Sequence, residues 1–343
     1  MPPSKRTKEY VENELPYKIL MQIYENSRAS LKELGRKLGI SYHVVAKVLE
    51  RLEHDSDIRY TVEVDEKKLG FAEGRIVLIK FGSAPSIDSL KERLQKDIFV
   101  QNAYMASGDF DLLLYVVGLN EHEFGSWQFK LRSEMSEYRP IVSASTIFAS
   151  VIGFFPLRSE ILEKSEVLSP LEKRILKLLN EDSRLKLREL VKRAKTTQMR
   201  VIYSIKKMKQ MGIIKRFTAL SQKPDKRLIV AYSVSQFPDD KHKDTRLRFW
   251  KEMLDENLKE VVNEYAIITD TVGAFDAIYV CAFNGGEEMS KRGTERIKRL
   301  FEFENPMIKS AMLTDLLVGK WPFHLEEYSY MKRSLAASSA RET

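Results

Sequence analysis

Residues 15–39, LPYKILMQIYENSRASLKELGRKLG, align without gaps on residues 171–195, LEKRILKLLNEDSRLKLRELVKRAK, at an offset of 156. The alignment continues to Ile58 and contains eleven identical positions, among them Ser27 with Ser183. Chance similarity between two helices rarely keeps one register over so long a stretch. Self-similarity at a fixed offset is the signature of an internal repeat, so this pair of stretches decides how the chain is organised.

The repeat extends into the second part of each copy. Residues 108–111, GDFD, match residues 273–276, GAFD, at an offset of 165, and an apolar run follows both. Residues 152–156, IGFFP, match residues 318–322, VGKWP, at an offset of 166. The 343-residue chain is therefore predicted to be a tandem duplication of one unit of roughly 150 residues.

Each copy begins with a pattern of three helices. In the first copy, apolar residues recur at helical spacing from Leu15 to Ile23, and a short helix is expected over residues 31–38 with Ser30 as its N-cap. A third helix follows Ser41 after a tight turn. Two short helices joined by such a turn are typical of a helix-turn-helix, in which the second helix enters the DNA major groove. Residues 58–64 alternate as a strand, which predicts a wing. The alternative to a helix-turn-helix is a small helical module for packing or dimerisation.

The rest of each copy alternates strands and helices. We expect strands over residues 75–81, 99–105, 111–117 and 141–152 and helices over 86–96 and 122–135 in the first copy. The second copy predicts strands over 228–237, 260–269, 276–283 and 308–318 and helices over 245–258 and 287–301. This β-α-β-β-α-β order is that of the ferredoxin-like fold, an α+β architecture with one sheet covered by two helices. A single module of this size has a thin core, so its bare sheet face favours pairing with a second copy.

These patterns divide the chain into seven segments. In order, they are a basic tail (1–13), a winged helix-turn-helix (14–65), a ferredoxin-like domain (66–156), a linker (157–169), a second winged helix-turn-helix (170–222), a second ferredoxin-like domain (223–325) and a tail (326–343).

This order of domains resembles the Lrp/AsnC (feast/famine) family of transcriptional regulators. The resemblance rests on the Leu69-Gly70-Phe71 entry to the first sheet, on Gly108-x-x-Asp111 and its second copy, and on Gly212-Ile213-Ile214 at the second wing. It implies a sequence-specific DNA-binding regulator whose ferredoxin-like domain, called the RAM domain, dimerises and binds a small effector, often an amino acid. It also implies double-stranded DNA as a partner, RAM pairing within the chain or in a homodimer, and a cytoplasmic prokaryotic protein that joins the nucleoid when bound.

Charge is distributed unequally between the two copies. The whole chain carries a net charge of +8 and has an isoelectric point near 9.2. Residues 14–60 carry a net charge of +1, whereas residues 170–216 carry +11. Because phosphate neutralisation supplies most non-specific DNA affinity, we expect the second helix-turn-helix to be the DNA anchor.

Candidate DNA contacts follow from the helical period of residues 198–210. Burial of Val201, Ile205 and Met208 is expected to turn Gln198, Arg200, Tyr203, Ser204 and Lys207 outward, after Thr197 as N-cap. Gln198 and Arg200 suit adenine and guanine edges, and Lys206, Lys207, Lys192 and Arg193 suit phosphates, although a solvated basic face is the alternative. The first copy offers the weaker set Tyr42, His43 and Lys47, which acidic residues follow.

The Gly-x-x-Asp loops are the candidate effector site that the resemblance implies. Glycine at 108 and 273 suits a turn where the backbone approaches a neighbour or a ligand closely. Asp111 and Asp276, or Asp109 in the first copy alone, could hold an ammonium group, whereas the alternative is a strand-entry turn with a capping or solvated Asp.

Other classes of protein find little support in the sequence. The single cysteine, Cys281, permits no internal disulfide, and no apolar run is long enough to span a bilayer. The five histidines lack the spacing of metal ligands, and no cofactor, metal or catalytic residue is predicted. The rival hypothesis is a siroheme decarboxylase, an enzyme class similar in domain order. Those enzymes place histidine near the Gly-x-x-Asp position, and residues 102–111 contain none.

Overall fold

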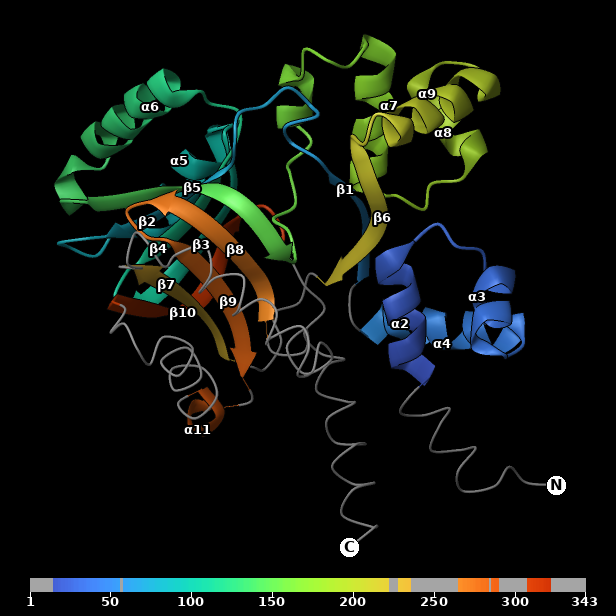
Figure 1. The fold of residues 1–343 in the computed structure, drawn as a ribbon, viewed down its shortest axis with the longest axis horizontal. Coiled ribbons are helices and arrows are strands. Elements are labelled where there is room, and N and C mark those ends of the chain that lie inside the picture. Colours follow the sequence, from blue (N-terminus) through green and yellow to red (C-terminus); the bar gives the residue numbers. More distant parts are fainter. Residues whose placement is uncertain are drawn as a thin grey trace, which may run out of the picture. The chain divides into compact units, whose positions relative to one another are not determined.

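The computed structural model describes residues 15–55, 58–221, 228–235, 265–283, 285–289 and 307–321 (Figure 1). These residues fall into two compact units. The first unit contains the described residues up to 69 and from 165 to 221, and the second contains residues 70–164 and the described residues from 228 to 321. Each unit thus takes residues from both halves of the sequence.

The first unit contains two groups of three helices, each followed by a strand. The elements are α2 (Leu15–Glu25), α3 (Leu31–Leu38), α4 (Tyr42–Asp55), β1 (Ile58–Val64), α7 (Pro170–Glu181), α8 (Leu187–Ala194), α9 (Gln198–Gln210) and β6 (Ile214–Ser221). The expected N-caps are confirmed, because the Ser30 hydroxyl accepts a hydrogen bond from the Glu33 amide at 3.2 Å and Thr197 accepts one from the Arg200 amide at 3.4 Å. Local capping signals therefore fix where these helices begin.

The strands of the first unit pair with each other. β1 and β6 form a two-stranded antiparallel sheet in which Thr61 lies opposite Thr218. α2 packs on β6, and α7 packs on β1, so each group of helices uses the strand of the other copy. The strand expected over residues 58–64 is present. It does not form a separate wing for the first group of helices, because it pairs with β6. One strand alone cannot satisfy its backbone N–H and C=O groups, and pairing with the equivalent strand does so.

The second unit contains most of the expected strands and helices. Its elements are β2 (Arg75–Lys80), α5 (Ile87–Lys96), β3 (Val100–Gly108), β4 (Leu112–Val116), α6 (Glu121–Glu134), β5 (Ile141–Ile152), β7 (Leu228–Ser235), β8 (Tyr265–Gly273), β9 (Ala277–Phe283), α11 (Gly286–Glu288) and β10 (Met307–Val318). The helices expected over residues 245–258 and over most of 287–301 lie outside the described residues. Residues 157–169, expected as a linker, contain a short 3-10 helix (Ile161–Lys164) whose Ile161 and Leu162 are buried.

All eight strands of this unit close into one barrel, in the order β10-β3-β4-β2-β5-β8-β9-β7. The first copy contributes β3-β4-β2-β5, and the second contributes β8-β9-β7-β10 in the same relative order. This is the order expected for a ferredoxin-like sheet. The two halves join where β3 pairs with β10 and β5 pairs with β8, so the sheets of the two halves of the sequence pair within the chain. Closure leaves no unpaired sheet edge in the barrel.

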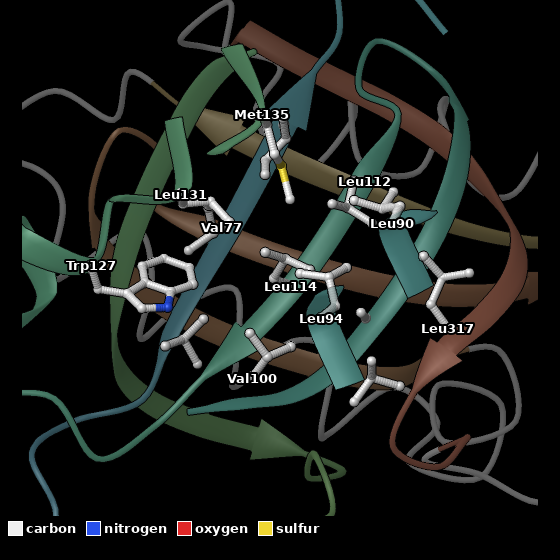
Figure 2. Packing of buried hydrophobic residues seen from close by; sticks show 14 of the residues in the cluster. Val77, Leu90, Leu94, Val100, Leu112, Leu114, Trp127, Leu131, Met135 and Leu317 are labelled. Carbon is white, nitrogen blue, oxygen red and sulfur yellow. The ribbon is translucent and has the colours of Figure 1, made fainter. Parts of the chain in front are cut away.

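A cluster of buried apolar side chains fills the space between the first half of the barrel and its two helices (Figure 2). Leu112 and Leu114 of β4 face Leu94 of α5 and Leu131 of α6, and Leu317 of β10 joins them from the other half of the sequence. Burial of this apolar surface holds α5 and α6 on the sheet. Among the described helices, none combines the length and the apolar character needed to cross a membrane.

Candidate nucleic-acid interface

The orientation of α9 decides which side chains the second recognition helix presents. Val201, Ser204 and Met208 form the buried stripe of the helix, and α9 packs against α7. The expectation that Ser204 points outward is wrong, because its exposed fraction is only 4%. Steps of about 100° per residue place positions 201, 204 and 208 on one side of a helix, so this geometry outweighs the polarity of the hydroxyl. Ile205, expected to be buried, is half-buried.

The outer face of α9 is partly apolar. Met199 is 75% exposed, Tyr203 is 68% exposed and Ile202 is 44% exposed. Tyr203 was among the sequence candidates, but Met199 and Ile202 were not. Met199 lies three and four residues before Ile202 and Tyr203, and Lys206 lies four and three residues after them, which places all four on one face of the helix. The sequence therefore indicated their exposure, but apolar residues on a helix are ordinarily expected to face the core.

The polar candidates at the start of this helix are open to solvent. Thr197, Gln198, Arg200 and Lys206 are all exposed, as is Lys192 at the end of α8. Positive charge therefore lies around the exposed apolar side chains of α9, as a surface that binds a polyanion requires.

Two of the side chains that were predicted to contact phosphate form ion pairs with carboxylates of the chain. Lys207 Nζ lies 2.8 Å from Glu172 Oε1 on α7, and an Arg193 guanidinium nitrogen lies 2.9 Å from Glu181 Oε2. The hydrogen bond that the Lys207 ammonium donates to Glu172 raises the pKa of Lys207. Burial acts to raise the pKa of Glu172, but hydrogen bonds from Lys207 and Ser169 outweigh it and lower that pKa. Lys207 thus ties α9 to the first turn of α7.

The first copy presents a different surface on α4. Tyr42, His43 and Lys47 are exposed as expected, and the rings of Tyr42 and His43 lie 3.8 Å apart between centroids. Val45, Val48 and Leu49 form the buried side of the helix. One turn beyond Lys47, the exposed Glu50 adds a negative charge. α4 is therefore less suited than α9 to contact phosphate.

Equivalent residues of the two copies hold the helix groups together. The buried hydroxyl groups of Ser27 and Ser183 lie 2.6 Å apart. Arg28 donates hydrogen bonds to the carbonyl oxygens of Ser183 and Leu185 at 2.5 and 3.2 Å. Its counterpart Arg184 lies over the ring of Tyr60 at 4.9 Å from the centroid. Both arginines are therefore engaged in joining the two groups.

The two Gly-x-x-Asp loops lie against the barrel junctions. A Cβ atom on Gly108, whose φ is +149°, would lie 2.4 Å from the backbone oxygen of Ser310. A Cβ atom on Gly273, whose φ is +143°, would lie 2.7 Å from the backbone oxygen of Ala144. Close approach to a neighbouring strand thus requires glycine at both positions.

The carboxylates beside Gly108 have partners within the chain. Asp111 accepts hydrogen bonds from Lys80 Nζ and from the Phe81 amide, both at 2.8 Å. Asp109 Oδ2 accepts a hydrogen bond from the Ser310 amide at 2.7 Å. Asp276 follows the second loop and donates its amide to the Val234 carbonyl at 2.7 Å. The two acids of the first loop therefore act as caps on adjacent strands.

A small cavity of about 70 Å³ lies between these loops. Residues from both halves of the barrel line it, including Lys80, Asp109, Phe110, Ser233, Phe275 and Lys309. A cavity of this size accommodates a few water molecules or a compact polar ligand.

Comparisons with known proteins agree with the helix-turn-helix assignment. Residues 168–215 match the family model described as winged helix-turn-helix DNA-binding. The HTH-type transcriptional regulator YugG of Bacillus subtilis is 27% identical over 135 residues, which cover 38% of this chain and 80% of YugG. LrpA of Pyrococcus horikoshii, also an HTH-type transcriptional regulator, is 29% identical over 102 residues, which cover 29% of this chain and 71% of LrpA. The chain is related to the Lrp/AsnC transcriptional regulators. The resemblance inferred from the sequence is thereby confirmed.

Solved structures of one enzyme are similar over nearly the whole chain. The siroheme decarboxylase NirDL matches with a TM-score of 0.59, covering 95% of this chain and 99% of that chain. The sequence identity is 15%, so this likeness shows the fold alone.

Proposed function

We propose that this protein is a sequence-specific DNA-binding transcriptional regulator in which a tandem duplication supplies two unequal winged helix-turn-helix modules. The observation that carries the proposal is the exposed face of α9, which cations flank within the segment that carries a net charge of +11. The DNA-binding family model covers the same helix. In this proposal α9 enters the major groove, Gln198 and Arg200 contact base edges, and Lys192 and Lys206 contact phosphates.

A titration of the full chain tests this assignment. Simultaneous substitution of Arg200, Lys206 and Lys207 by alanine should nearly abolish binding to duplex DNA in fluorescence anisotropy, because three positive charges leave the anchor helix. Lys47→Ala, which removes an exposed positive charge from α4, should cost little. Equal losses from both changes would contradict the unequal roles of the two modules, and circular dichroism checks that the variants remain folded.

The duplication also predicts how the two modules share one DNA site. The equivalent pairings Ser27–Ser183 and Thr61–Thr218 relate the two helix groups by an approximate two-fold axis, as in a dimer of helix-turn-helix proteins. We expect a pseudo-palindromic target with half-sites of unequal affinity, the stronger one bound by α9. DNase footprinting on a selected target should show one half protected at lower protein concentration, whereas equal protection of both halves would contradict this arrangement.

The barrel cavity is the proposed effector site. It lies between Gly108 and Gly273 and is lined by Lys309 and Ser233, which offer a cation and a hydroxyl to an amino acid or another small polar ligand. A thermal-shift screen of amino acids and metabolites should find a stabilising ligand, and Lys309→Ala should weaken that stabilisation. If no compound stabilises the protein, the cavity has no effector role.

The likeness to NirDL supports a second candidate function, a siroheme decarboxylase built on the same domain order. The cavity between the two Gly-x-x-Asp loops has no histidine among its lining residues, and its volume of about 70 Å³ is far smaller than the volume of a tetrapyrrole. Incubation with siroheme followed by an absorbance spectrum separates the two functions. A bound haem-type spectrum favours the enzyme, whereas DNA capture without such a spectrum favours the regulator.

A further inference from the structure

An apolar ridge lies along the face of α9 that is proposed to enter DNA. Met199, Ile202 and Tyr203 are exposed and lie next to one another on adjacent turns, with Lys206 continuing the ridge. The opposite side of the helix already supplies the core through Val201 and Met208. Met199 and Tyr203 therefore contribute little to packing within the unit, because water contacts most of their surface, and Ile202 is exposed over 44% of its surface.

The surroundings of the ridge favour a polyanion with apolar groups. Arg200, Lys206 and Lys209 are exposed on the same helix. A purely apolar protein partner would offer no negative charge to these cations. DNA offers phosphates to the cations and apolar groups to the exposed apolar side chains. In the major groove, phosphates lie on either side of the base edges, and the 5-methyl group of thymine is the apolar group on those edges.

We infer that the ridge formed by Met199, Ile202 and Tyr203 reads thymine 5-methyl groups in the major groove. Sequence preference at these positions then comes from apolar contact as well as from the hydrogen bonds of Gln198 and Arg200. Methyl recognition presupposes the DNA binding proposed above and adds the kind of base-edge group that α9 selects.

The other recognition helix provides an internal comparison. At the offset of 156, the α4 residues equivalent to Met199, Ile202, Tyr203 and Lys206 are His43, Ala46, Lys47 and Glu50. None of these is a large aliphatic or aromatic hydrocarbon. Dependence on the methyl group is therefore confined to the half-site that α9 contacts.

The test compares thymine with uracil, which removes only the methyl group and keeps every hydrogen-bonding group of the base pair. A target is first selected from random duplex DNA with the full-length protein. Each thymine in the target is then replaced singly by deoxyuridine, and affinities are measured by anisotropy. We expect a loss of about fourfold for each contacted methyl group, in one half-site only.

Variants connect this effect to the ridge. Met199→Ala and Ile202→Ala should weaken binding to the thymine target by a similar factor, yet leave binding to the matching uracil target nearly unchanged. Lys206→Gln is the matched control: it should weaken both targets equally and reduce the salt dependence by about one released counterion. Because Met199 is exposed, its substitution should leave the melting temperature unaltered.

The outcomes separate the two proposals. If the protein selects and binds a target but thymine and uracil bind alike, methyl recognition is overturned and the DNA-binding function stands. If Met199→Ala and Ile202→Ala leave DNA affinity unchanged while altering the mass of the protein in solution, the ridge is a protein contact and methyl recognition is overturned again. If no duplex binds, both proposals fail.

Discussion

Ser27 and Ser183 align with each other at the offset of 156, and their buried hydroxyl oxygens lie 2.6 Å apart. The hydrogen bonds around them repeat as well. The Ser27 amide donates to the Phe217 carbonyl at 2.9 Å, and the Ser183 amide donates to the Tyr60 carbonyl at 3.2 Å. A residue that meets its own equivalent lies at a local two-fold axis, so this pair marks the axis of the first unit.

Removal of one hydroxyl should therefore destabilise the first unit. Ser27→Ala leaves the Ser183 hydroxyl with only a weak contact of 3.4 Å to the Thr218 carbonyl, so we expect a loss of about 1 kcal/mol in the free energy of unfolding. The double variant with Ser183→Ala should cost less than the sum of the single changes, because no hydroxyl is left without its partner. Urea denaturation measures both effects. The exposed Ser89→Ala, which should stay within about 0.5 kcal/mol of wild type, is the control, and strict additivity would contradict the direct bond.

The ion pair between Glu172 and Lys207 predicts a dependence of stability on pH. The pKa of Glu172 is lowered in the folded chain, so its contribution to stability is present above the unfolded pKa and is lost as the pH falls through the folded value. Wild type should therefore lose more stability than Glu172→Gln between about pH 6 and pH 3. The pKa of Lys207 is raised, so its share persists below its unfolded pKa and is lost only as the pH rises through the folded value. If the free energy of unfolding falls equally for wild type and Glu172→Gln over the acid range, the proposed contribution of the Glu172–Lys207 ion pair to stability is wrong.

The junction between β3 and β10 predicts a strong effect of one added methyl group. In Gly108→Ala, the new Cβ would lie 2.4 Å from the Ser310 oxygen at a φ that favours glycine. We expect a loss of more than about 2 kcal/mol, because the displaced atoms belong to a backbone paired in the barrel. Gly125→Ala in α6 is the matched control, since no atom lies within 4 Å of its added Cβ. It should raise stability by about 0.5 to 1 kcal/mol through helix propensity. Equal melting temperatures for the two variants would contradict this account.

The sequence predicted the local elements but missed the pairing of β1 with β6. Caps at Ser30 and Thr197 and the strand alternation around Arg75 are encoded by near neighbours, so the helices expected within the described residues and most strand bounds agree with the structure. The partner of β1 lies about 150 residues away, and nothing in residues 58–64 identifies it. Ser204 was misplaced because its polarity was given more weight than its position on the buried stripe. The roles of the DNA and effector candidates stay predictions, since geometry alone gives their exposure and partners.

The exchanged strands predict that the two halves of the chain stay together after the connection between them is cut. A protease site inserted after Glu166, an exposed residue, would separate the two copies covalently. The pairings β1–β6, β3–β10 and β5–β8 would still join the resulting fragments. Because separation would expose three sets of unpaired backbone groups and parts of the apolar clusters, we expect the cleaved fragments to co-elute in size-exclusion chromatography and to separate only in denaturant. Elution of two independent fragments under native conditions would contradict the interleaved arrangement, and the uncleaved insertion variant controls for effects of the added residues.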